Sequence, residues 1–320
     1  MTNIWVTGAS SLIGYGILKS IRGSKKSFKL VGSTIHKDSI APAFTDICIE
    51  APFNGAKGYI EWILSVIETY DIDLVIPSFE EDVLFLTNHR KQIESTGVKV
   101  VLNTFELVHL CKDKWIFYQV LKNNNCPHVI PSSLSSDFNI LENEFGLPLL
   151  LKPRQGNASK GIVKVYNKEA FEQHKAEIGK NLMVQPLIGS DDQEFTTGAF
   201  CDGKGGYNAI ITFRRELSKN GYTNVAEVVE NEEIEAAVLA ICKILKPIGP
   251  TNFQFRIHNG VFQLLEINPR FSASTSLRSA FGYNDALMSI EYFMEGKIPI
   301  QPKIKMGKAI RYIEDFIVYS

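Results

Sequence analysis

The sequence predicts a mixed fold, with a parallel α/β sheet near the N-terminus and antiparallel α+β structure after it. Between residues 3 and 102, apolar strand-like runs alternate with amphipathic stretches, which is the pattern of a parallel sheet with helices on both faces. Near the C-terminal end, two runs of alternating apolar residues flank a Gly-containing turn at 258–260, which predicts a β-hairpin.

The N-terminal elements follow from their apolar spacing. We expect strands at 3–7, 28–33, 74–77 and 99–102, and helices at 12–21, 59–70 and 82–93. Ligands of parallel sheets bind at the carboxyl ends of the strands, so the loops 8–11 and 78–82 are candidates for ligand contact. Ser10 lies in the first loop. Glu80, in the second, could bind an amine or an amino acid, although an acidic helix N-terminus is the more ordinary explanation.

The hairpin sorts its side chains onto two faces, because alternate residues of a strand point to opposite sides. With 258–260 as a three-residue loop, Gln254 faces Leu264 and Asn252 faces Glu266. One face is then a core face, made of Phe253, Phe255, Ile257, Val261, Leu265 and Ile267. The other face is polar, made of Asn252, Gln254, Arg256, Glu266 and Asn268, with Arg270 just beyond. A two-residue loop would place Gln254 and Glu266 on opposite faces, so the prediction depends on the turn.

The polar face offers metal ligands in a small area. Gln254, Glu266 and Asn268 supply oxygen atoms, which Mg²⁺ requires, usually as one or two carboxylates together with substrate phosphates. Arg270 could meet phosphate oxygens. A solvated strand face with ordinary polar residues explains the same spacing equally well. Only other parts of the sequence can distinguish a metal site from such a face.

The stretch 252–276, with its Glu266-Ile267-Asn268-Pro269-Arg270 segment, resembles the end of the ATP-grasp fold in its carbamoyl-phosphate-synthetase-like branch. That branch also includes stand-alone carboxylate–amine ligases such as the pyrrolysine-biosynthesis ligase. The resemblance covers residues 110–295. It implies that Gln254, Glu266 and Asn268 hold Mg²⁺ (or Mn²⁺) around the triphosphate of ATP, and that Arg270 contacts the γ-phosphate or an acyl-phosphate.

Two further landmarks concern the phosphates. The strand 149–153 resembles the family strand whose basic residue, here Lys152, meets the α- and β-phosphates. The segment 154–162 resembles the glycine-rich loop that closes over the triphosphate, with Gly156, Ser159 and Gly161 as its contacts. Glycines and small side chains let backbone N–H groups approach phosphate oxygens.

The remaining landmarks concern the nucleoside and the acyl-phosphate. The segment 183–189 resembles the hinge beside adenine, and the residues implied as nucleotide contacts are Lys114, Gln185, Leu187, Ile188 and Glu194, the last at the ribose. Arg214 and Arg215 precede a loop at 219–223 that matches the family. One of the two, taken here as Arg215, is expected to reach the acyl-phosphate, although exposed paired arginines are usually a solvated face.

Composition limits the class of protein. The net charge is −1, so no general attraction to nucleic acid or to an anionic membrane is implied. No apolar run approaches the roughly 20 residues that span a bilayer. The five cysteines form no Cys-x-x-Cys pair, which argues against zinc and disulfides and favours the cytoplasm. The expected partners are small-molecule carboxylates and amines (an amino acid, a peptide or a sugar acid), and a homodimer is compatible with the family.

The resemblance implies a three-part architecture. Residues 1–108 form a Rossmann-like pre-ATP-grasp domain, residues 109–180 the first ATP-grasp lobe with the Gly-rich loop, and residues 181–320 the second lobe with the metal-binding hairpin. The implied reaction is ATP-dependent ligation: a carboxylate attacks the γ-phosphate, giving ADP and an acyl-phosphate, and an amine then displaces phosphate to form an amide.

Two other functions fit parts of the sequence. The segment 6–14 resembles the start of an NAD(P)-dependent short-chain or extended dehydrogenase or epimerase, and Tyr118 and Lys122 have the spacing of that family's catalytic pair. However, Ser11 replaces the middle glycine, and no acidic residue promptly follows the second strand. The third option is a nucleotide-binding protein that has lost catalysis, whose sign would be damage to the metal or phosphate residues.

Overall fold

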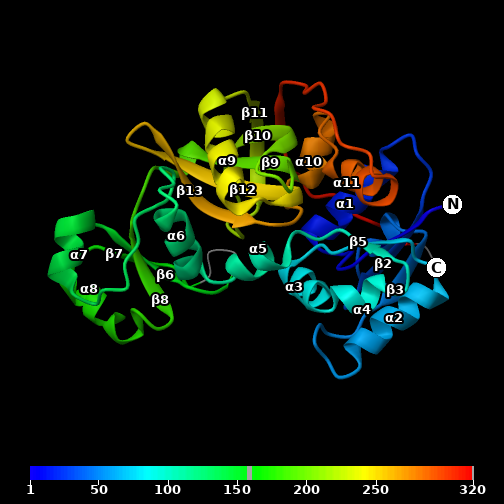
Figure 1. Cartoon of the computed structure of the whole chain (residues 1–320), viewed down its shortest axis with the longest axis horizontal. Helices are drawn as coiled ribbons and strands as arrows, with labels where there is room; N and C mark the ends of the chain where they lie inside the picture. The colour runs from blue at the N-terminus through cyan, green and yellow to red at the C-terminus, as the bar shows by residue number, and fades with distance from the viewer. Residues whose placement is uncertain (157–160, 319–320) are drawn as a thin grey trace.

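The computed structural model describes residues 1–156 and 161–318. The described residues form three sheets: a five-stranded parallel sheet, a three-stranded antiparallel sheet and a six-stranded sheet. Figure 1 shows the parallel sheet at one end of the molecule, the three-stranded sheet at the other, and the six-stranded sheet between them. None of the described helices is long and apolar enough to cross a membrane.

The N-terminal parallel sheet has the strand order β3-β2-β1-β4-β5. Its strands are β1 (Asn3–Val6), β2 (Lys29–Thr34), β3 (Ile47–Glu50), β4 (Leu74–Ile76) and β5 (Lys99–Val100). Its helices are α1 (Leu12–Arg22), the 3₁₀ helix η1 (Ala41–Ala43), α2 (Tyr59–Thr69), α3 (Glu80–Asn88) and α4 (Arg90–Glu94). The predicted parallel α/β sheet is confirmed, but β3 was missed and the expected helix 82–93 is two helices that meet at His89.

The three-stranded sheet follows two connecting helices, α5 (Phe105–Leu110) and α6 (Lys114–Asn123). Its strands, in the order β7-β6-β8, are β6 (Leu149–Pro153), β7 (Val163–Val165) and β8 (Leu182–Pro186). Helices α7 (Phe138–Phe145) and α8 (Lys168–Glu172) and the 3₁₀ helix η2 (Lys175–Glu177) complete this unit. Although β8 lies beyond residue 180, where the sequence placed the end of the first lobe, it pairs with β6.

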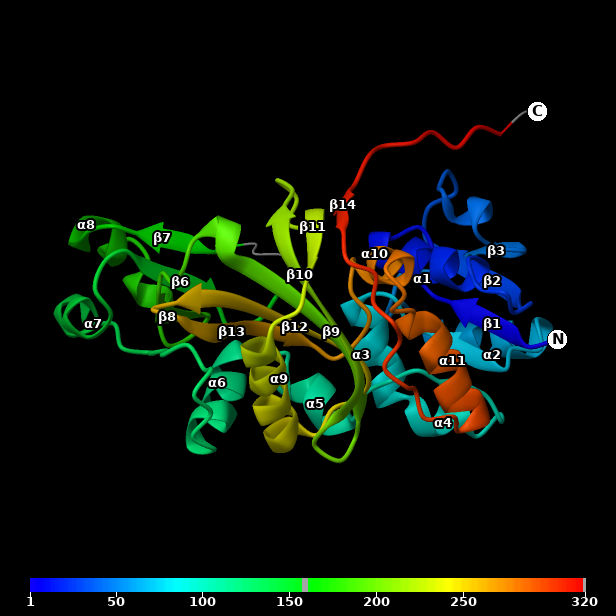
Figure 2. The same ribbon diagram turned by 90° about the horizontal axis from the view of Figure 1, so that it is seen from above.

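The six-stranded sheet has the order β13-β12-β9-β10-β11-β14. Its strands are β9 (Glu194–Asp202), β10 (Tyr207–Leu217), β11 (Thr223–Val229), β12 (Ile248–His258), β13 (Val261–Asn268) and β14 (Lys308–Ile310). Its helices are η3 (Asp191–Gln193, 3₁₀), α9 (Glu232–Leu245), α10 (Thr275–Ala280) and α11 (Asp285–Glu295). Figure 2 shows α10 and α11 between this sheet and the N-terminal domain, and Ala286 and Ile290 of α11 share a core cluster with Ile17 of α1.

The hairpin turn differs from the prediction, and a β-bulge compensates for the difference. The loop is the two-residue Asn259-Gly260, whose φ angles of 52° and 75° suit the Asn-Gly turn that matches strand twist. The strands nevertheless shift register between Gln254 and Phe255, so that Gln254 pairs with Glu266. Leu265 is the extra residue. Because a bulge adds one residue to one strand, the polar pair stays on one face despite the shorter loop.

The bulge also changes the core face of β13. The predicted core residues Val261 and Leu265 are not buried: Val261 is 42% exposed and Leu265 is half-buried. Phe262 and Leu264 are buried in their place. The alternation pattern was therefore one residue out of phase along the part of β13 between the turn and the bulge.

A buried polar cluster joins α10 and α11 to the six-stranded sheet. The Nη2 atom of Arg278 donates to Asn252 Oδ1 (2.6 Å) and Thr196 Oγ1 (3.1 Å). The Oδ1 atom of Asp285 is buried and has no hydrogen-bond partner among the described residues. Burial raises the pKa of Asp285 to about 6, although Arg278 opposes the shift.

The raised pKa of Asp285 predicts a pH-dependent stability. Because the folded state binds an extra proton between the unfolded pKa of 3.8 and about 6, stability falls as the pH rises through that window. We expect Asp285→Asn to match the parent near pH 4 and to exceed its free energy of unfolding by about 2–3 kcal/mol near pH 7. Urea denaturation at both pH values measures this, with exposed Asp38→Asn as the control. An equal effect at both pH values would contradict the assignment.

Candidate functional site

A cavity of about 290 Å³ lies between the three-stranded sheet and the β12–β13 hairpin. Most predicted site residues line it: Lys114, Lys152, Gly156, Gln185, Leu187, Ile188, Glu194, Arg215, Gln254 and Glu266. A smaller cavity of about 70 Å³ adjoins it on the side of the N-terminal domain. Asn268 and Arg270 line this second cavity, together with Lys114, Lys152 and Glu266.

Two predicted contacts of the glycine-rich loop are not placed in the cavities. Ser159 lies outside the described residues, and Gly161 is not part of either lining. Gly156 lines both cavities, and its carbonyl oxygen accepts a hydrogen bond from Lys114 Nζ at 2.6 Å. The φ angles of Gly156 (105°) and Gly161 (75°) lie in the region that favours glycine, which accounts for glycine at both positions.

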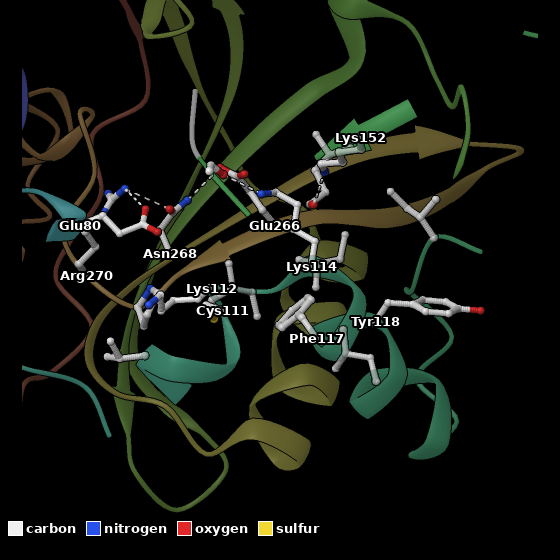
Figure 3. Close-up of a pocket in the computed structure, with 18 of the residues that line it drawn as sticks. Glu80, Cys111, Lys112, Lys114, Phe117, Tyr118, Lys152, Glu266, Asn268 and Arg270 are labelled. Atoms are coloured by element: carbon white, nitrogen blue, oxygen red, sulfur yellow. Dashed lines mark hydrogen bonds and ion pairs between the residues drawn. The ribbon is translucent and has the colours of Figure 1, made fainter. Parts of the chain in front are cut away.

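Glu266 is the carboxylate at the centre of the site. Figure 3 shows it on the hairpin between Lys152 and Asn268. Burial opposes its ionisation, but Lys152, the hydrogen bond from Asn268 Nδ2 (3.0 Å), Lys114 and Arg270 outweigh burial and hold the pKa of Glu266 below its usual value. Glu266 is therefore a negative charge at neutral pH, surrounded by cations.

Lys152 and Lys114 place positive charge in the site, although burial disfavours the charged form of both side chains. Burial lowers the pKa of Lys152, which is only 8% exposed, and Glu266 opposes that shift. Burial likewise lowers the pKa of Lys114. Lys152 Nζ donates to the Leu265 carbonyl at 3.3 Å, at the bulge of β13. Because burial penalises both ammonium groups, an anionic ligand between them would stabilise their charged forms.

The predicted metal ligands form a continuous polar set along the hairpin. Gln254 and Glu266 are cross-strand partners, and Asn268 follows Glu266 on the same face. In the structure, Gln254 Oε1 accepts from Arg215 Nη2 (2.7 Å) and Asn268 Oδ1 accepts from Arg270 Nη2 (3.1 Å). One ionised carboxylate and two amide oxygens on one face suit the oxygen chemistry of Mg²⁺.

Glu194 has a structural role that the sequence did not indicate. It is 3% exposed, and its two oxygens accept from different arginines: Oε1 from Arg215 Nη2 (2.7 Å) and Oε2 from Arg256 Nη2 (2.8 Å). Arg215 continues the network to Gln254. Glu194 thus fixes two cavity-lining guanidinium groups, whether or not it also meets a ribose.

Removing the Glu194 carboxylate is expected to destabilise the fold strongly. Glu194→Ala would leave Arg215 and Arg256 without their shared acceptor, and breaking a buried ion pair by removing one partner costs about 3–5 kcal/mol. Chemical denaturation measures the loss, and Glu216→Ala, on the exposed side of β10, is the matched control with a change of about 0.5 kcal/mol or less. Equal stability of the two variants would show that the network contributes little.

Of the two adjacent arginines, one lies at the surface and the other lines the cavity. Arg214 is exposed and pairs with Glu227 Oε2 at 2.5 Å, so of the two arginines only Arg215 lines the cleft.

Glu80 lies close to Arg270, with Arg270 Nη2 and Glu80 Oε2 3.7 Å apart. Burial raises the pKa of Glu80, which Arg270 counteracts. Figure 3 shows Glu80 and Arg270 together at the end of the cavity nearest the N-terminal domain.

Sequence reasoning gave several cavity-lining residues no role. Ile130 and Leu265 line both cavities, and Leu150 and Arg256 line the larger one. Arg256 could be placed on the polar face from alternation, but its pairing with Glu194 joins strands far apart in sequence. The Tyr118–Lys122 pair lies on α6, where Lys122 Nζ is 5.5 Å from the centre of the buried Tyr118 ring, as on an ordinary helical face.

The chain is similar to ATP-grasp proteins and to carbamoyl phosphate synthases. Residues 179–316 match a family model described as "ATP-grasp in the biosynthetic pathway with Ter operon". The arginine-specific carbamoyl phosphate synthase large chain of Geobacillus stearothermophilus is 25% identical over 241 residues, an alignment that covers 69% of this chain and 22% of that relative. The chain thus spans only about a fifth of this relative's length.

Solved structures match nearly the whole chain. A biotin carboxylase–β-γ-ATP complex from Campylobacter jejuni has a TM-score of 0.75 at 19% identity, covering 95% of this chain and 74% of that one. An N5-carboxyaminoimidazole ribonucleotide synthetase from Thermotoga maritima has a TM-score of 0.65 at 18% identity, covering 94% and 78%. At these identities the matches establish the fold.

Proposed function

We propose that this chain, which is an ATP-grasp protein, joins a carboxylate to an amine and converts ATP to ADP and phosphate. The ATP-grasp assignment rests on the family match and the carbamoyl phosphate synthase relatives, and the solved structures share the fold. The reaction is inferred from the site, because the chain spans only part of its curated relatives. In this proposal the parallel-sheet domain, the three-stranded lobe and the six-stranded lobe each contribute one wall.

One observation carries the proposal: the larger cavity and the smaller one share Lys114, Lys152 and Glu266. A nucleotide in the larger cavity, with adenine beside Leu187 and Ile188, would bring its γ-phosphate to this shared boundary. The smaller cavity, which holds Arg270 and Glu80, would then receive the substrate that the γ-phosphate meets. The arrangement separates nucleotide from substrate and brings them together at three charged groups.

The proposed reaction has two steps. A substrate carboxylate oxygen attacks the γ-phosphorus, the bond to the bridging oxygen breaks, and ADP leaves. The amine nitrogen then attacks the acyl carbon, the acyl–phosphate bond breaks, and the nitrogen loses a proton as phosphate leaves. Phosphoryl transfer depends chiefly on positioning and on neutralising charge.

The chain's own residues supply that positioning. Lys114 and Lys152 would hold phosphate oxygens, and Arg270, with Arg215 behind Gln254, would stabilise charge on the transferred phosphoryl group. Gln254, Glu266 and Asn268 would hold Mg²⁺ or Mn²⁺, which supplies charge neutralisation on the phosphates when bound. Lys152 is buried and Glu266 is half-buried, and the limited access of water strengthens these interactions.

Release of ADP from Mg²⁺-ATP tests the proposal, with the purified chain screened against pools of carboxylates and amines. A pool that raises ADP and phosphate together, with a product whose mass equals the condensed pair minus water, supports the ligase and identifies its substrates. If ATP binds but no pool stimulates ADP release, the inactive nucleotide-binding alternative is favoured. The intact set of Lys152, Gln254, Glu266, Asn268 and Arg270 argues against that outcome.

A further inference from the structure

A separate cavity of about 250 Å³ opens in the N-terminal domain, at the carboxyl ends of β1, β2 and β4. It is lined by the loop 8–11 after β1, by Thr34 and His36 at the end of β2, and by Asp82 on α3. Its lining shares no described residue with the two cavities of the ligation site. In open parallel sheets, this end of the strands is where ligands bind.

The walls of this cavity combine apolar side chains, such as Ile35, Pro52 and Phe79, with mostly uncharged polar ones. Ser10 Oγ and Thr34 Oγ1 lie 2.7 Å apart and form one wall. Ser11 caps α1 by accepting a hydrogen bond from the Gly14 N–H at 2.9 Å. Among the described lining residues there is neither lysine nor arginine. A phosphate ligand would therefore lack a cationic partner.

Asp82 is the charged group of the cavity. It is 3% exposed, and its Oδ1 accepts from Asn54 Nδ2 (2.7 Å) and from the Tyr59 hydroxyl (3.1 Å). Within the described part of the chain it forms no ion pair. Burial raises the pKa of Asp82, although its hydrogen bonds, including those from Asn54 and Tyr59, oppose the shift. A buried carboxylate with neutral donors alone is costly, and a cation beside it would offset that cost.

We propose that this cavity binds a small molecule that carries a protonated amine, with the ammonium group beside Asp82 and hydroxyl or carbonyl groups toward Ser10 and Thr34. The carboxylate excludes anions such as nucleotides and sugar phosphates from the same position. The site is distinct from the ligation site, because Glu80 lines the ligation cavity while Asp82 lines this one, although both belong to the first turn of α3.

Calorimetric titration of the full chain with matched amines and alcohols tests the site. The pairs are ethanolamine and ethylene glycol, 1,4-diaminobutane and 1,4-butanediol, and glucosamine and glucose. We expect at least one amine to bind about tenfold or more tightly than its uncharged partner. Equal binding within every pair, or no binding by any amine, would overturn the proposal.

Two variants locate the binding within the cavity. Asp82→Asn keeps an acceptor for Asn54 and Tyr59 but loses the charge, and Ser10→Phe fills the cavity from its rim. Each is expected to weaken amine binding at least about tenfold, whereas Ser65→Phe, exposed on α2, is the matched control. Glu266→Gln should leave amine binding unchanged, which separates this site from the ligation site. Unchanged binding in both cavity variants would overturn the assignment.

Discussion

Glu266→Gln is expected to reduce ADP release at least about a thousandfold while the chain stays folded. The substitution keeps the size and the hydrogen-bond acceptor of the side chain but removes the only carboxylate among Gln254, Glu266 and Asn268. It also removes the negative charge that faces Lys152 and Lys114. Both changes weaken the hold on a metal ion and disturb the balance of charge around the phosphates.

The control for this prediction is Glu227→Gln on β11. Glu227 is 44% exposed and pairs with Arg214 at the surface of the same sheet, so the same chemical change there should leave ADP release unaltered. Circular dichroism of both variants checks the fold. ADP release by Glu266→Gln at the rate of the parent would show that the metal ligands are assigned to the wrong residues.

Lys152→Ala is expected to weaken ATP binding at least about tenfold. The ammonium group of Lys152 lies in the lining of both cavities and opposite Glu266, where a triphosphate would pass. Burial lowers the pKa of Lys152, so the charged form is costly without an anion and contributes most when phosphate is bound. Isothermal titration with ATP measures the change.

The control for Lys152 is Lys168→Ala. Lys168 is exposed at the start of α8 and lies outside both cavity linings, so its removal should leave ATP affinity unchanged. Unchanged ATP affinity in Lys152→Ala itself would mean that the triphosphate lies elsewhere in the molecule.

Most of the N-terminal fold could be predicted because its strands are buried apolar runs. Ile4, Trp5 and Val6 of β1 and Leu74, Val75 and Ile76 of β4 are all fully buried, and periodicity identifies such runs. The edge strand β3 was missed because its residues alternate between half-buried and exposed and carry little apolar signal. The break at His89 also escaped, since no Pro or Gly marks it.

The site shows a sharper limit of sequence reasoning. The shared face of Gln254 and Glu266 was expected, and it holds because Leu265 bulges out of β13. The predicted cross-strand partners were wrong, because Gln254 pairs with Glu266 instead of Leu264, and Asn252 pairs with Asn268 instead of Glu266. A bulge depends on how strands meet in three dimensions, which one sequence does not record. The same applies to Glu194, whose two arginines come from β10 and β12. Residue types at the site could be predicted, whereas their partners could not.

The most direct test of the central claim follows oxygen atoms from the carboxylate to phosphate. The chain is incubated with Mg²⁺-ATP, an amine and a carboxylate labelled with ¹⁸O in its carboxyl group, taken from the pool that stimulates ADP release. The proposed acyl-phosphate predicts one ¹⁸O atom in each phosphate released, because the carboxylate oxygen that attacks the γ-phosphorus leaves with it. Phosphate without ¹⁸O, formed together with ADP and the amide, would contradict the acyl-phosphate mechanism.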